Sequence, residues 1–299
     1  MQHITRTTKL GAAVLAGAVS VVLAGCGGGG SSASSDYEVV ESPSFDSGTT
    51  MAKLADKGKV TVGVKFDQPG IGYKGAGSDA PEGFDIEMAK IVAGQLGLSP
   101  DQIEWKETVS DNREPFLQNG VVDLVIASYS ITDDRRKVVG QAGPYYVTGQ
   151  QLLVREEDKD KITGPKDLDG VKVCSVTGST SIQTVTEKYG ANPVPFDTYS
   201  ACVRQLENGT VDAVTTDGAI LLGYAAQKPD ELEVVGPTFS EERYGIGFAK
   251  GDTAMCQFLH KTINDSCDNG SWEEAFQSTL GEAGVDTPKP PKTDTNCGA

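Results

Sequence analysis

Charged and hydroxyl side chains follow two similar segments of the chain, at the points where each segment ends. Ser128-Tyr129-Ser130 and Arg135 come after the first segment, and Thr216-Asp217 come after the second. An arginine can hold a carboxylate through two parallel hydrogen bonds, and an aspartate can hold an ammonium group. Arg135 and Asp217 would therefore suit an α-amino acid, which carries both charges. The alternative is that both are ordinary charges at helix ends.

The two segments that precede these side chains are almost the same. Residues 117–125 read LQNGVVDLV and residues 206–214 read LENGTVDAV, so six of nine positions are identical. Each copy is typical of a helix end, a glycine in the left-handed conformation and a buried strand. Two such units predict two lobes with a ligand cleft at the carboxyl ends of their strands. Alternatively, the two segments are alike only because Asn-Gly is a common sequence at the turn between a helix and a strand.

The rest of the pattern alternates strands with helices, which predicts an α/β fold. Strands are expected at 60–64, 121–127, 151–155, 171–176, 211–215, 232–235 and 244–249. Helices are expected at 84–96, 112–119, 199–208, 217–227, 252–266 and 271–280, with shorter ones from 133 and 180. Thr132 is the expected N-cap of the helix at 133, and Ser271 and Glu274 form an expected capping box.

The amino terminus predicts export. Arg6 and Lys9 precede an apolar stretch, residues 10–23, which is too short for a stable span and typical of a signal peptide covering residues 1–25. Leu23-Ala24-Gly25-Cys26 resembles the bacterial lipobox, which implies a diacylated Cys26 and anchoring at the outer face of the cytoplasmic membrane. Ordinary cleavage without lipid is the alternative. Residues 26–50 are expected to form a flexible tether.

Five cysteines remain beyond Cys26, so at least one is unpaired. Cys174 and Cys202 fall in a strand and a helix of the same predicted lobe and are expected to bond. Cys256 and Cys267 lie on one helix, roughly 16 Å apart, beyond disulfide reach. We therefore pair Cys256 with Cys297 and expect Cys267 to be free.

Other function classes find little support in the composition. The formal charge of −16 argues against nucleic acid, which requires a basic face. With two histidines and no Cys-x-x-Cys, no metal site is expected. Residues 70–75 match G-x-G-x-x-G, but no helix signal follows, so no dinucleotide or other cofactor is expected.

Six short motifs make residues 58–281 similar to the bacterial periplasmic-type solute-binding proteins for polar amino acids. The motifs are EGFDIEMA (82–89), VDLVIA (122–127), SITDDR (130–135), PYY (144–146), GSTS (178–181) and VDAVTTD (211–217). The resemblance implies a two-lobed fold with a hinged cleft. It implies that Arg135 grips the ligand α-carboxylate, with Ser128, Ser130 and Thr180 as further contacts, and that Asp217 binds the ammonium.

Three further residues bear on specificity. In glutamate/aspartate binders of that family, basic residues face the ligand side chain at the positions of Lys65 and Arg113, and Ser110 lies beside them. The resemblance therefore implies an acidic ligand, with glutamate favoured and aspartate or glutamine left open. The alternatives are that Lys65 and Arg113 are solvated, or that Asp67 neutralises Lys65. Tyr199 stands where the family has a histidine.

Together these features predict a monomeric lipoprotein receptor that delivers glutamate to the permease of an ABC importer and catalyses no reaction. Its first lobe would comprise residues 51–147 and 241–299, and its second lobe residues 148–240. Two rivals remain open. One is an exported enzyme of the same fold acting on a small carboxylate, since relatives of this family include a dehydratase. The other is a sensory receptor with a signalling partner.

Overall fold

The computed structural model of the protein describes residues 37–297, which belong to one unit of the chain, residues 35–299. The predicted signal peptide, Cys26 and the first part of the tether lie outside the described residues. Within the described range, no helix combines the length and the apolar character needed to cross a bilayer.

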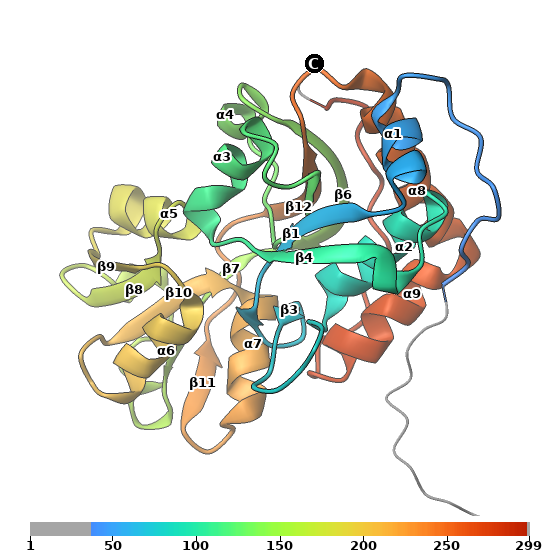
Figure 1. Ribbon diagram of the computed structural model, residues 1–299. Helices are drawn as coiled ribbons and strands as arrows, with labels where there is room; N and C mark the ends of the chain where they lie inside the picture. The colour runs from blue at the N-terminus through green and yellow to red at the C-terminus, as the bar shows by residue number, and fades with distance from the viewer. Residues whose placement is uncertain (1–36, 298–299) are drawn as a thin grey trace, which may run out of the picture. The chain divides into compact units, whose positions relative to one another are not determined.

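The first sheet has five strands in the order β4-β1-β5-β12-β6 (Figure 1). Its strands are β1 (Val60–Val64), β4 (Ile103–Glu107), β5 (Leu124–Val125), β6 (Gly140–Thr148) and β12 (Glu242–Phe248). β1 is parallel to β4 and β5, and β12 is antiparallel to β5 and β6. The alternating residues Val60, Val62 and Val64 point to one face of β1 and are all buried, as expected for a strand face that packs on the core.

Helices surround this sheet and bury the apolar core. They are α1 (Thr50–Lys57), α2 (Phe84–Gln95), α3 (Arg113–Gln118), α4 (Asp133–Arg136), α8 (Thr253–Asn269) and α9 (Ser271–Phe276). A short hairpin, β2 (Asp67–Gln68) and β3 (Gly72–Tyr73), follows β1. This hairpin occupies the Gly70–Gly75 motif, so no helix starts where a dinucleotide fold would need one.

The second sheet also has five strands, in the order β11-β7-β10-β8-β9. Its strands are β7 (Gln150–Arg155), β8 (Lys172–Val176), β9 (Asn192–Phe196), β10 (Ala213–Asp217) and β11 (Leu232–Val235). The helices α5 (Thr180–Tyr189), α6 (Tyr199–Glu207) and α7 (Gly218–Gln227) pack around it (Figure 1). The two sheets with their helices form two lobes, which confirms the predicted two-lobed α/β fold.

The repeated segment plays the same part in both lobes. Gly120 and Gly209 have φ values of 63° and 70°, as predicted for glycines after a helix end. The Asp123 carboxylate accepts a hydrogen bond from the Thr61 amide, and the Asp212 carboxylate accepts one from the Lys172 amide. The repeated aspartate therefore ties each central strand to its neighbour. The strand of the first copy was predicted at residues 121–127. In the structure it is shorter, because β5 comprises only Leu124 and Val125.

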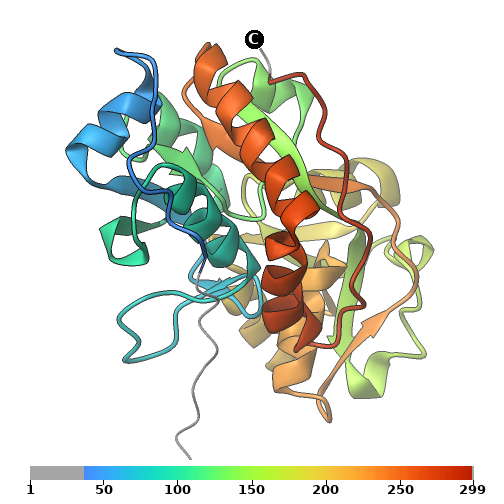
Figure 2. The same cartoon turned by 90° about the vertical axis from the view of Figure 1, so that its right-hand side faces the viewer.

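The chain passes between the lobes twice. β6 ends at Thr148 in the first sheet and β7 begins at Gln150 in the second, while the return runs between β11 and β12. The two connections pass close together, since a Cβ at Gly149 would lie 2.5 Å from the Ser240 carbonyl oxygen. After β12, α8 packs on β6 of the first sheet. Figure 2 shows the C-terminal segment returning alongside α8.

Residues 37–49 are not a free tether, so the prediction of flexibility up to residue 50 is wrong for this part. The Val40 amide donates to the Gly94 carbonyl at 2.9 Å. Phe45 packs edge-on against Phe258 of α8, with ring centroids 5.8 Å apart. Aromatic residues in an otherwise polar stretch can bury enough apolar surface to hold it on the first lobe.

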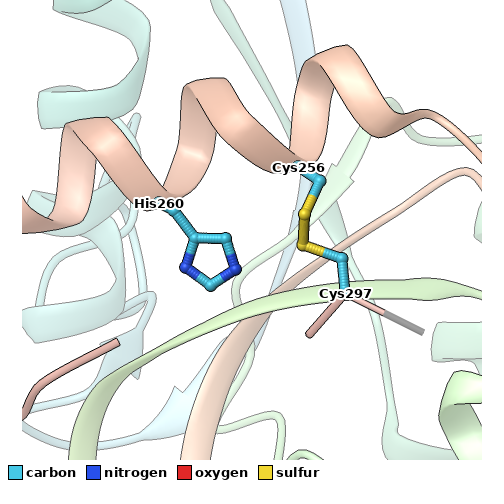
Figure 3. A group of neighbouring side chains, drawn as sticks. All are labelled: Cys256, His260 and Cys297. Atoms are coloured by element: carbon cyan, nitrogen blue, oxygen red, sulfur yellow. A yellow bond between two sulfur atoms is a disulfide. The ribbon is translucent and has the colours of Figure 1, made fainter. Parts of the chain in front are cut away.

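The structure contains both disulfides that the sequence predicts. Cys174 of β8 bonds to Cys202 of α6, and Cys256 of α8 bonds to Cys297, while Cys267 is free. They close loops of 28 and 41 residues, each worth about 3–4 kcal/mol in the chain-entropy account. His260 lies beside the second bond (Figure 3). The two sulfur atoms of this group are bonded to one another, so the group is a disulfide with a neighbouring imidazole.

The helix ends confirm one capping prediction and contradict another. The Thr132 hydroxyl accepts a hydrogen bond from the Arg135 amide, as an N-cap should. Ser271 is not an N-cap, because it is the first residue of α9 and the N-cap position is held by Gly270, whose φ is 88°. The Ser271 hydroxyl donates to the Asn269 side chain instead. The predicted capping box is therefore wrong by one position, since α8 and α9 share the glycine between them.

Candidate functional site

A narrow pocket lies between the two lobes, at the ends of β5 and β10. The residues that line it are mostly hydroxyl-bearing or charged: Ser110, Arg113, Ser128, Ser130, Ser179, Thr180, Ser181, Tyr199, Thr216, Asp217 and Ile220. Six of the eight predicted ligand-binding residues are among them: Ser110, Arg113, Ser128, Ser130, Thr180 and Asp217. The other two, Lys65 and Arg135, lie one hydrogen bond away from this lining.

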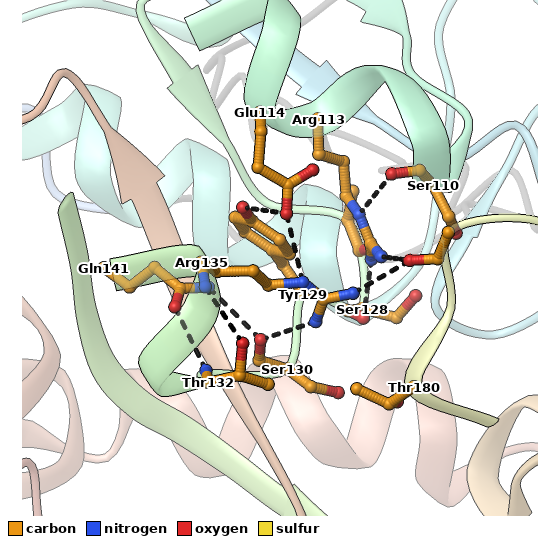
Figure 4. A network of polar contacts seen from close by, with 12 residues as sticks. Ser110, Arg113, Glu114, Ser128, Tyr129, Ser130, Thr132, Arg135, Gln141 and Thr180 are labelled. Atoms are coloured by element: carbon orange, nitrogen blue, oxygen red, sulfur yellow. Dashed lines mark hydrogen bonds and ion pairs between the residues drawn. The ribbon is translucent and has the colours of Figure 1, made fainter. Parts of the chain in front are cut away.

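Arg113, the first residue of α3, places a buried guanidinium in the pocket wall (Figure 4). Its Nε donates to the Ser110 carbonyl at 3.1 Å, and its Nη1 donates to the Ser128 carbonyl at 3.2 Å. The guanidinium lies over the Tyr129 ring, 4.6 Å from the centroid. Burial, and then the charge of Arg135, lower the pKa of Arg113 to about 10, so it stays charged at neutral pH.

Lys65 follows β1 and is only 3% exposed. Its Nζ donates to the Ser110 hydroxyl at 2.8 Å, so Ser110 stands between this ammonium and the pocket. Burial, and then the charge of Arg113, lower the pKa of Lys65 to about 7. Within residues 37–297, neither Lys65 nor Arg113 forms an ion pair with a carboxylate. Two buried cations without an anion predict that the pocket takes a negatively charged group.

Asp67 does not pair with Lys65, although the sequence left that possibility open. Its carboxylate accepts hydrogen bonds from the amides of Tyr199 and Ser200, at the start of α6 in the other lobe. Asp67 still raises the pKa of Lys65, but less than burial and Arg113 lower it.

Ser128 and Ser130 belong to a loop that Asp85 holds from behind. Ser128 has a φ of 43°, which is uncommon for a residue other than glycine. The Asp85 carboxylate accepts hydrogen bonds from the Ser128 amide at 2.7 Å and from the Tyr145 hydroxyl at 2.6 Å. Burial raises the pKa of Asp85 to about 6. These contacts fix the Ser128 and Ser130 carbonyls, which accept from Arg113 and Arg135 respectively.

Arg135 lies beside the pocket, where it lines an adjoining hollow with Glu114, Gly178 and Thr180. Its Nε is 3.1 Å from the Glu114 carboxylate (Figure 4). Its Nη2 donates to the Gly178 carbonyl of the second lobe at 3.0 Å. The sequence did not indicate the pairing with Glu114. The contact to Gly178 means that Arg135 already bridges the two lobes.

Asp217, the last residue of β10, supplies the pocket with a negative charge. It is 4% exposed, and the Tyr244 hydroxyl donates to its Oδ2 at 2.5 Å. Its Oδ1 is buried and has no hydrogen-bond partner among the described residues. Burial, and then the charge of Glu242, raise the pKa of Asp217 to about 7. A buried acceptor without a donor suits an incoming ammonium group.

Thr180, the first residue of α5, brings a hydroxyl from the second lobe. That hydroxyl donates to the Glu242 carboxylate at 3.0 Å. Ser179 is the N-cap and accepts from the Ile182 amide. Ser179, Ser181, Thr216 and Ile220 were not among the predicted site residues, although they lie in or near the Gly178–Ser181 run and the Thr216-Asp217 pair, and Tyr199 was noted only as standing where the family has a histidine. Hydroxyls clustered at a helix start were the signal for the first two.

Comparison with known proteins places this geometry in context. The sequence profile described as "Bacterial extracellular solute-binding proteins, family 3" matches residues 60–282. The glutamate-binding protein GluB of Corynebacterium efficiens is 37% identical over 294 residues, covering 94% of each chain. The ABC transporter glutamine-binding protein GlnH of Bacillus subtilis is 34% identical over 264 residues, covering 88% of this chain and 93% of that protein.

A solved structure is similar to the chain in fold as well. An ancestral arginine-binding protein bound to arginine superposes with a TM-score of 0.69 and 35% identity, covering 74% of this chain and 98% of that one.

Proposed function

Because the chain belongs to family 3 of the bacterial extracellular solute-binding proteins, we propose that it captures glutamate between its lobes for an ABC importer. The observation that carries this proposal is the pair of buried cations, Lys65 and Arg113, opposite Asp217 with its unpartnered Oδ1. Glutamate has one negative charge more than a neutral amino acid and matches this excess of positive charge. The names of the GluB and GlnH relatives agree with glutamate or glutamine as ligand.

In this proposal each end of the ligand has its own partners. The α-ammonium replaces the missing donor at Asp217. The α-carboxylate is held by Arg135, with Ser128, Ser130 and Thr180 beside it. The side-chain carboxylate faces Lys65, Ser110 and Arg113. Arg135 and Thr180 must then exchange internal partners, Gly178 and Glu242, for the ligand.

The proposed organisation of the chain follows the two passages between sheets. Lobe one comprises residues 51–147 and 241–299, lobe two residues 148–240, and the lobes close about residues 148–150 and 236–241. Residues 1–25 would be a signal peptide and Cys26 the lipid-bearing residue that anchors a monomer at the membrane, close to its permease. No catalysis is proposed, and the relatives reported above are named as binding proteins.

A screen of the twenty amino acids by thermal unfolding tests the ligand. Glutamate should give the largest shift, because a ligand that binds only the native state adds about 2.7 kcal/mol at 100 times its Kd. Mass spectrometry of the recovered ligand should show glutamate unchanged, whereas turnover would favour the exported enzyme. The absence of a shift with glutamate, aspartate and glutamine would contradict the proposal. A permease encoded nearby would support transport over sensing.

Glutamate affinity should be highest near pH 7 and fall on both sides. An ammonium ligand favours ionised Asp217, so below its pKa of about 7 binding must release a proton, and affinity rises with pH there. A carboxylate ligand favours charged Lys65, so above its pKa of about 7 binding must take up a proton, and affinity falls as pH rises. Calorimetry from about pH 5 to 9 checks this. A flat profile would show that neither group titrates on binding.

A further inference from the structure

The β2–β3 hairpin of lobe one reaches across to α6 and α7 of lobe two. Asp67 Oδ2 accepts hydrogen bonds from the Tyr199 amide at 2.7 Å and from the Ser200 amide at 3.2 Å. Thr198 caps the same helix from within lobe two, but it accepts from the Ala201 amide. The first amides of a helix have no partner inside the helix. Asp67 therefore completes the cap of α6 from the opposite lobe.

A second contact fixes the same hairpin on α7. The Tyr224 hydroxyl donates to the backbone carbonyl of Asp67. One residue earlier, Gly223 packs against the hairpin so closely that an added Cβ would lie 2.2 Å from the Pro69 carbonyl oxygen. Real Cβ atoms do not approach oxygen so closely, so this surface fits lobe one only with glycine at position 223.

These contacts connect lobe closure with the pocket. Tyr199 is the residue whose amide Asp67 binds, and its side chain lines the pocket. Asp67 itself does not line the pocket. A negative charge at the start of α6 is also favourable with respect to the helix dipole. An open arrangement of the lobes would separate Asp67 from α6 and release Tyr199.

We propose that Asp67 is a positioning residue that latches the lobes in the closed state and sets how long a ligand is retained. The inference rests on the proposed capture of an amino acid by lobe closure. The latch touches no ligand atom, so it stabilises the closed complex equally for every ligand. Its loss lowers the closed fraction, and apparent affinity falls in proportion to that fraction.

The test uses the full mature protein with Asp67→Ala, and Gly223→Ala as an independent disturbance of the same interface. Both variants should raise the dissociation rate of glutamate by about tenfold. Asp67→Ala removes hydrogen bonds to a charged group, which are among the stronger ones, and Gly223→Ala places a Cβ against the Pro69 carbonyl oxygen. Because Asp67 also raises the pKa of Lys65, the ratio of glutamate to glutamine affinity is compared in Gly223→Ala, where it should stay unchanged. Asp79→Ala, at an exposed residue after the hairpin, is the matched control and should behave as the parent.

The separation of the lobes gives a second readout that needs no ligand. Spin labels on exposed positions of α1 and α5 should show a larger open population in Asp67→Ala than in the parent, with an unchanged melting temperature. If the parent binds glutamate and both variants keep its dissociation rate and lobe distances, the latch is refuted while the receptor stands. If the parent binds no amino acid but Asp67→Ala still opens the lobes, the latch stands and the proposed function fails.

Discussion

Asp217→Asn should weaken the binding of every amino acid by about 2–5 kcal/mol, or about 30-fold to several thousand-fold. The substitution keeps the size of the side chain but removes the buried charge that faces the ammonium. Asp217 Oδ1 has no donor among residues 37–297, so this oxygen is left without a hydrogen bond until a ligand ammonium arrives. Calorimetry with glutamate, aspartate and glutamine measures the loss, which should be similar for all three because all carry the α-ammonium.

The controls for this variant separate binding from folding. Because burial raises the pKa of Asp217, removing its charge should not lower the melting temperature of the empty protein. Asp212→Asn changes the carboxylate just before the first residue of β10, far from the pocket end of that strand. Its carboxylate accepts a hydrogen bond from the Lys172 amide, so this variant should leave ligand binding unchanged. Arg135→Ala should also weaken all three ligands through their shared α-carboxylate. Asp217→Asn with parental affinity for glutamate would exclude the assigned ammonium site.

Lys65→Met should reduce the preference for glutamate over glutamine by about 10- to 100-fold, because a hydrogen bond to a charged group contributes about 1.5–3 kcal/mol. Only glutamate carries a charge at its side-chain end. Met preserves the apolar stem that is packed at a site 3% exposed. The quantity to measure is the ratio of the two Kd values, since general damage to the cleft cancels in a ratio.

Two further variants make this test sharper. Arg113→Ala should change the ratio in the same direction, although it also leaves the carbonyls of Ser110 and Ser128 without a donor and will lower stability. Lys106→Met removes a lysine from the exposed part of β4, where it lies over Phe116, and should leave the ratio as in the parent. If Lys65→Met weakens the binding of glutamate and glutamine equally, the assigned specificity is refuted, whereas the proposed receptor function is not contradicted.

The ion pair with Glu114 explains how the Arg135 guanidinium can stay buried and charged when no ligand is bound. Arg135 is paired with the Glu114 carboxylate, and the Tyr129 hydroxyl donates to the same carboxylate. An arginine has five donors, so Arg135 can keep this pair and still offer two parallel hydrogen bonds to a carboxylate. Glu114 therefore lowers the cost of burying Arg135 in the empty site.

Local signals in the sequence were enough for the architecture. The repeat around Gly120 and Gly209 predicted two equivalent α/β units, because a glycine after a helix and an apolar strand are encoded within about nine residues. Helix geometry excluded a disulfide between Cys256 and Cys267, and the pairing of Cys256 with Cys297 was then predicted from the cysteines that remained. Four of the eleven pocket residues, Ser128, Ser130, Thr216 and Asp217, follow the two repeated segments, at the sheet edge where α/β folds place their ligands.

The tertiary structure decided which of these charged groups meet. Asp67 is 132 residues from Tyr199 in sequence, yet it binds the Tyr199 amide and not its near neighbour Lys65. The packing of residues 37–49 on α2 and α8 and the partner of Arg135 were likewise decided by the fold. Periodicity and capping signals report on neighbours along the chain. The partner of a buried charge depends on which side chains the two lobes bring within about 3 Å, and no local pattern encodes that distance.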